Sequence, residues 1–162
     1  MTIKEMSEIF ALMLLAWPNA PMLRPENLEA TINLWTLCLP EVDFLTGQMA
    51  TIQLCRTCHY PPSIAQMCEA AEEVRKELET EISGAMLSMR NQYFYGGYDA
   101  NRKARAIALM GGEERLWIPI NEREAMFNID DFREAYLRAC QEEVNRTVAA
   151  LYPAESGAKR LR

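Results

Sequence analysis

Histidine, glycine and long apolar runs are scarce in this chain of 162 residues. His59 is the single histidine, so no site built from protein ligands alone contains two imidazoles. No uncharged apolar run reaches the roughly 18 residues that a spanning helix needs, so we expect no membrane contact. Seven glycines, ten methionines and an odd number of cysteines, five, indicate an intracellular helical protein rather than a disulfide-bonded scaffold.

The charge balance argues against broad binding of nucleic acid. The chain has 17 Lys and Arg against 23 Asp and Glu, a net charge of −6, and such a surface repels a phosphate backbone. The excess acid belongs to residues 1–92, because residues 93–162 hold 11 basic and 11 acidic side chains. We therefore expect no direct nucleic-acid partner and look for a protein partner first in the balanced C-terminal part.

Apolar residues at helical spacing, interrupted by prolines, predict an all-α fold. Thr2 and Glu5 form a capping box, as do Ser63 and Gln66, and Asp130 or Asp131 is the expected cap of the last helix. In the third helix we expect Leu45, Met49, Ile52 and Cys55 to face the core. The predicted helices cover about 2–17, 25–39, 43–58, 63–91, 99–110 and 130–152.

These helices predict a compact N-terminal domain of about four helices, residues 1–92, and a C-terminal helical region, residues 93–153. The aromatic and glycine-rich turn at 93–98 marks the boundary. Residues 113–128 are irregular, and we interpret them as a loop against the helices. Residues 154–162 form a flexible basic tail.

The apolar segment Ile9–Trp17 resembles the core of a signal peptide. Glu5 and Glu8 precede it where a signal peptide carries positive charge, and Pro18 and Pro21 occupy the cleavage region. We therefore expect the first helix to belong to the mature protein, and the protein to be cytoplasmic.

Cys55-Arg56-Thr57-Cys58-His59 has the spacing of c-type haem attachment, a chemistry that takes place outside the cytoplasm. A zinc or redox module would use Cys55, Cys58 and Cys68, but the spacing is irregular, and we favour thiols that act as small apolar side chains. No phosphate loop, dinucleotide fingerprint, nucleophile elbow or metalloprotease pair is present. We expect no enzyme activity, no metal and no cofactor.

The order of the first three helices, with Thr31-Ile32-Asn33-Leu34-Trp35 and then Tyr60-Pro61-Pro62-Ser63-Ile64-Ala65-Gln66-Met67, resembles the N-terminal domain of the phage replicative-helicase loader/inhibitor family. The resemblance covers residues 1 to about 75. Phe132-Arg133-Glu134-Ala135-Tyr136 is similar to a helix near the C-terminus of related prophage proteins.

The resemblance implies a noncatalytic adaptor in the host cytoplasm. Such an adaptor binds a DnaB-type hexameric replicative helicase, holds it inactive and delivers it to an origin-bound initiator protein. On this basis we expect partner contacts at Phe132, Tyr136, Lys159, Arg160 and Arg162. A structural phage protein such as a tail-assembly chaperone, also small, helical and acidic, is the alternative, and the module on Cys55, Cys58 and Cys68 is a further one.

Overall fold

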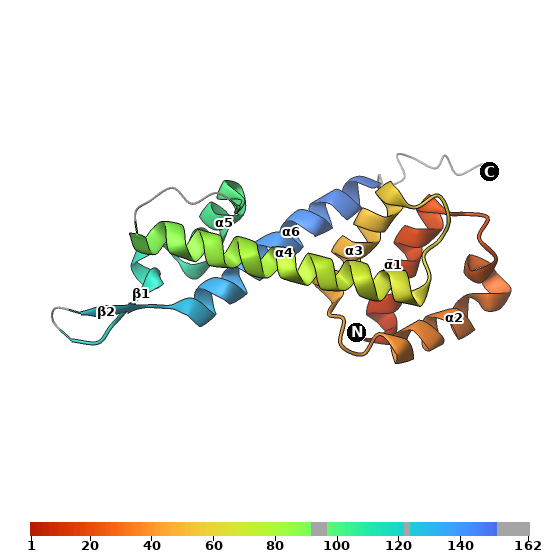
Figure 1. The fold of residues 1–162 in the computed structure, drawn as a ribbon, viewed down its shortest axis with the longest axis horizontal. Coiled ribbons are helices and arrows are strands. Elements are labelled where there is room, and N and C mark those ends of the chain that lie inside the picture. The colour runs from red at the N-terminus through yellow and green to blue at the C-terminus, as the bar shows by residue number, and fades with distance from the viewer. Residues whose placement is uncertain (92–96, 122–123, 152–162) are drawn as a thin grey trace, which may run out of the picture. The chain divides into compact units, whose positions relative to one another are not determined.

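A computed structural model describes residues 1–91, 97–121 and 124–151 (Figure 1). The described residues confirm the all-α fold, with a small two-stranded sheet as its only β-structure. No helix among them is both long and apolar enough to cross a membrane. The elements are α1 (Ile3–Ala16), η1 (Pro21–Leu23), α2 (Pro25–Cys38), α3 (Phe44–Thr57), α4 (Ile64–Asn91), α5 (Ala100–Met110), η2 (Glu113–Leu116), β1 (Trp117–Pro119), β2 (Ala125–Phe127) and α6 (Ile129–Leu151).

The chain divides into two compact units, Met1–Lys103 and Ala104–Arg162. The division falls within α5, whereas the sequence placed a boundary after Gln92. The glycine and aromatic turn that suggested this boundary lies mostly outside the described residues. The functional division into 1–92, 93–153 and 154–162 stays a prediction.

Helix capping follows the predicted residues at α1 and α4 but not at α6. The Glu5 N–H donates to Thr2 Oγ1 at 3.2 Å, and the Thr2 N–H donates to Glu5 Oε2 at 2.7 Å, which completes the predicted box. The Ser63 N–H likewise donates to Gln66 Oε1 at 2.9 Å. Asn128, not Asp130 or Asp131, caps α6: its side-chain oxygen accepts from the Asp131 N–H at 3.4 Å.

The core of the first unit is built on α3, which contacts both α1 and α4. Trp35 is buried as expected and meets Phe10 edge to face, with ring centroids 5.2 Å apart. The predicted inward face of α3 is wrong in register, because Met49, Ile52 and Cys55 are only half-buried. The buried residues of α3 are instead Leu45, Thr46, Gly47, Gln48, Ala50, Thr51 and Leu54.

Small and polar residues line this face because α1 and α3 lie close together. A Cβ atom on Gly47 would lie 2.8 Å from Ile9 Cδ1 and 3.1 Å from the Met1 sulfur. Thr51 is fully buried and satisfies its hydroxyl by donating to the Gly47 carbonyl at 2.8 Å. Polar residues therefore face this core without unpaired groups.

The second unit contains a β-hairpin within the segment expected to be a loop. β1 and β2 are antiparallel, with Trp117 opposite Phe127, Ile118 opposite Met126 and Pro119 opposite Ala125. Trp117 meets Phe127 edge to face at 5.4 Å, and Phe127 contacts Phe132 at 5.8 Å, which lies 5.9 Å from Tyr136. This aromatic chain anchors the hairpin on the N-terminal half of α6.

Candidate partner-binding surfaces

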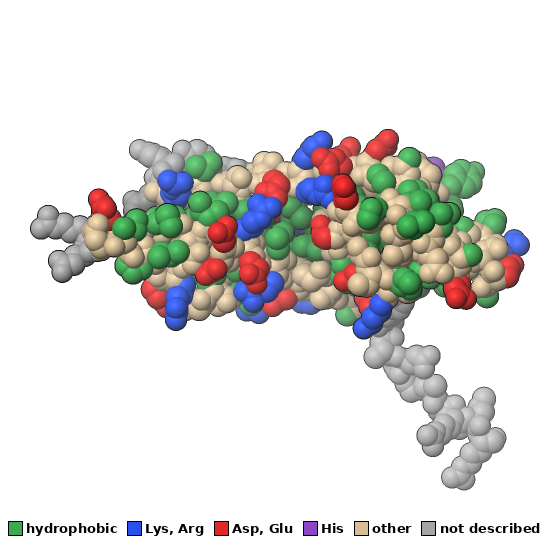
Figure 2. Space-filling model, turned by 90° about the horizontal axis from the view of Figure 1, so that it is seen from below, with side chains coloured by type: hydrophobic (Ala, Val, Ile, Leu, Met, Phe, Trp, Pro, Cys, Tyr) green, Lys and Arg blue, Asp and Glu red, His purple; other side chains and the backbone are tan. Residues whose placement is uncertain are grey.

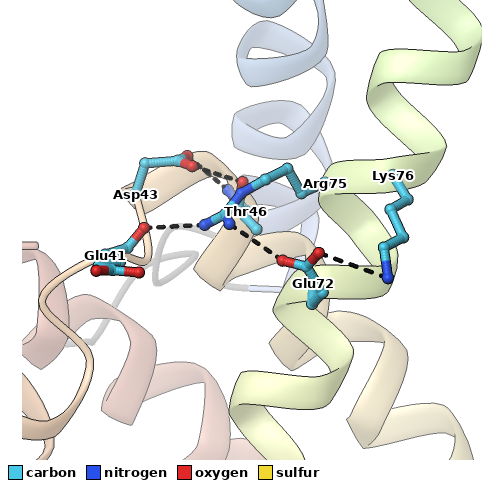
Figure 3. Close-up of polar contacts among 6 residues, drawn as sticks. All are labelled: Glu41, Asp43, Thr46, Glu72, Arg75 and Lys76. Atoms are coloured by element: carbon cyan, nitrogen blue, oxygen red, sulfur yellow. Dashed lines mark hydrogen bonds and ion pairs between the residues drawn. The ribbon is translucent and has the colours of Figure 1, made fainter.

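A hollow of about 450 Å³ lies in the first unit between the α2–α3 connection and α4. Arg75 of α4 holds its edge: Nη2 donates to the Glu41 carbonyl at 2.9 Å and Nη1 to Glu72 Oε2 at 3.1 Å (Figure 3). Glu72 also pairs with Lys76 at 3.5 Å. The lining residues are Cys38, Leu39, Pro40, Glu41, Val42, Cys68, Ala71, Glu72 and Arg75.

Further contacts fix the α2–α3 connection beside this hollow. The Thr46 N–H donates to Asp43 Oδ1 at 2.9 Å and the Thr46 hydroxyl to Oδ2 at 2.7 Å, so Asp43 caps α3 (Figure 3). The N-terminal ammonium donates to the Val42 carbonyl at 3.3 Å. The loop therefore has a defined conformation set by α1, α3 and α4.

The cysteines of the zinc or redox alternative do not gather into a metal site. In the described part of the chain, no group of three or more His, Cys, Asp or Glu side chains is placed to hold a metal ion. Cys68 is exposed and shares the hollow with Cys38, whereas Cys55 and Cys58 are half-buried. Burial raises the pKa of the Cys55 thiol, and Cys58 adds to this shift, so Cys55 stays protonated and weakly nucleophilic at neutral pH.

The most apolar exposed segment of the second unit is the β-hairpin. Ile120 is 62% exposed and Met126 is 55% exposed, and Trp117, Ile118 and Ile129 each expose more than a third of their surface. On the β1 side, a hollow of about 360 Å³ is lined by Leu109, Met110, Arg115, Trp117, Ile118, Pro119, Asn128, Asp131, Glu134 and Arg138. Sequence reasoning missed this surface, although Trp117-Ile118-Pro119-Ile120 is an apolar run outside any helical pattern.

The predicted contact residues fall into two groups. The side chains of Phe132 and Tyr136 are fully buried in this structure, so they belong to the core and present no surface to a partner in this conformation. Lys159, Arg160 and Arg162 lie outside the described residues. The role of all five in partner binding stays a prediction.

The small basic cluster on α5 is largely neutralised by neighbours within each unit. Arg102 Nη1 donates to both oxygens of Glu81, at 2.8 and 3.1 Å. Arg105 forms a two-bond pair with Glu142, at 2.7 and 3.0 Å, which lowers the pKa of that carboxyl. On the face drawn in Figure 2, acidic and basic side chains are interspersed with apolar ones. That face offers no continuous track of positive charge for a phosphate backbone.

Taken with the helical fold, these surfaces define a small helical protein suited to contacts with other proteins. Residues 1–68 match the family model of the phage helicase-loader/inhibitor N-terminal domain. The match agrees with the resemblance seen in the sequence and indicates a phage helicase-associated protein, the family-level partner being a DnaB-type helicase. Comparison with curated proteins and with solved structures finds no match.

Proposed function

We propose that this protein is a noncatalytic adaptor that binds a hexameric DnaB-type replicative helicase. It holds the ring inactive in the host cytoplasm and delivers it to an initiator protein bound at the phage origin. The match of residues 1–68 to the helicase-loader N-terminal domain is the observation that carries this proposal.

The electrostatics of the chain suit this role. A net charge of −6 keeps the adaptor itself off DNA while it escorts a ring that must bind DNA. The helicase, rather than DNA, is then the direct target, and the initiator is reached through the complex.

The experiment that tests the proposal is gel filtration of the whole chain with a purified DnaB-type helicase and ATP. We expect the protein to co-elute with the hexamer and to lower its ATPase rate. If it neither co-elutes nor changes the ATPase rate, the proposal is wrong.

A matched pair of variants locates the contact. Replacing Lys159, Arg160 and Arg162 together by Glu reverses the predicted contact charges, whereas replacing Lys4, Lys76 and Arg90 by Glu makes the same charge change elsewhere. We expect the first variant to lose co-elution and the second to keep it. Equal loss in both would assign the effect to net charge alone.

A further inference from the structure

The β-hairpin has two different edges. The Ile120 N–H donates to the Glu124 carbonyl at 2.9 Å and the Asn128 N–H to the Leu116 carbonyl at 2.8 Å, which fixes the alternation of the antiparallel ladder. Residues 116, 118 and 120 therefore bond to residues 128, 126 and 124 across the hairpin. The backbone groups of Trp117 and Pro119 point out from β1, and those of Ala125 and Phe127 point out from β2.

Only the β2 edge offers a complete set of backbone groups. Pro119 has no N–H, and a proline at an outward position blocks strand addition. Ala125 and Phe127 each present an outward N–H and C=O, and none of these groups bonds to another described residue outside the hairpin. Ala125 is also exposed, so a strand has access to this edge.

The side chains around this edge are apolar. Because cross-strand partners share a face, Ile118 and Met126 lie on one face with Ile120, opposite the face on which Phe127 packs onto the helices. Sheets of only two short strands are weakly stable in water, and additional strands stabilise them. The hairpin therefore gains both backbone bonds and apolar burial from a further strand.

We propose that β2 of a second copy of this chain adds to this edge, which joins two hairpins into one four-stranded antiparallel sheet about a two-fold axis. The axis passes through Met126. Ala125 then pairs with Phe127 of the second copy, and Phe127 with its Ala125, so that all the outward groups are used.

Two features favour a second copy over an unrelated strand. The edge is self-complementary, because the same pair of residues supplies donors and acceptors on both sides of a two-fold axis. In this register Glu124 lies opposite Asn128 of the second copy, so no like charges meet, and the two Met126 side chains meet at the axis. Closed pairing of this kind also removes the exposed edge of each protomer.

Sedimentation equilibrium over a range of protein concentrations tests the dimer. We expect the average mass to rise from 18.6 kDa towards twice that value with concentration. Ala125→Pro removes the outward N–H without touching the internal ladder, and weakens association about tenfold or more. Ala125→Val adds similar bulk but keeps the N–H, and leaves association unchanged.

The side chains at the two-fold axis give a test specific to a second copy. Met126→Lys alone and Met126→Glu alone each place like charges opposite one another and abolish the dimer. An equal mixture of the two variants restores association, because Lys then meets Glu. These exposed positions tolerate the change, so the mixture remains decisive even if Ala125→Pro unfolds the hairpin. A wild-type chain that stays monomeric, or a mixture that fails to associate, overturns the proposal, including the case in which the same variants abolish only helicase binding.

Discussion

Gly47 is the position at which α3 comes closest to α1. A larger side chain there meets Ile9 and Met1, and overpacking of this kind costs about 1–3 kcal/mol. We predict that Gly47→Leu lowers the free energy of unfolding by this amount in urea titrations. Thr57→Leu, at an exposed position of the same helix, changes it by less than about 0.5 kcal/mol. Equal stability of the two variants would contradict the close approach.

The Arg105–Glu142 pair predicts a pH-dependent contribution to stability. The hydrogen bonds from Arg105 lower the folded-state pKa of Glu142 below its unfolded value of about 4.3. Stability from this pair is therefore present above that pH and is lost as the pH falls through the lowered pKa. We predict that Glu142→Gln lowers the melting temperature at pH 7 but leaves it equal to the wild type near pH 2.

Thermal melts of both proteins across this range, at low salt, measure the effect, because salt screens exposed pairs. A Glu142→Gln difference that persists unchanged at low pH would mean that the charge pair is not its source.

At the scale of single elements, the start of α6 depends on Asn128. Its side chain accepts from the Asp131 N–H, and its amide donates to Asp131 Oδ2 at 2.7 Å. We predict that Asn128→Ala costs about 1 kcal/mol of stability in chemical unfolding, whereas Asn128→Ser retains most of it because serine also caps helices. If Asp130→Ala costs as much as Asn128→Ala, the cap is assigned wrongly.

The helices were predictable from the sequence because their ends carry local signals. Thr2 and Ser63 bond to residues three positions ahead, so the caps depend on nothing outside one turn. The core face of α3 was not predictable in this way. Gly47, Gln48 and Thr51 are buried because of how closely α1 approaches, and that distance is a tertiary property. The hairpin was missed since strands of three residues are too short to show an alternation.

At the scale of the whole molecule, the sequence reached the family but not the contact surface. The motif Tyr60–Met67 lies within the matched residues 1–68, so the resemblance rested on a segment with a specific pattern. Phe132 and Tyr136 were chosen from an aromatic stripe on a helix, and such a stripe has the same appearance whether it faces a partner or the core. Their burial shows that they face the core here.

The central claim is that this protein binds a replicative helicase directly. The most direct measurement is a fluorescence anisotropy titration of the labelled whole chain with an ATP-bound DnaB-type hexamer, in the absence of DNA. The account predicts a saturable rise in anisotropy that unlabelled protein reverses. An anisotropy that stays flat as the helicase concentration increases would contradict it.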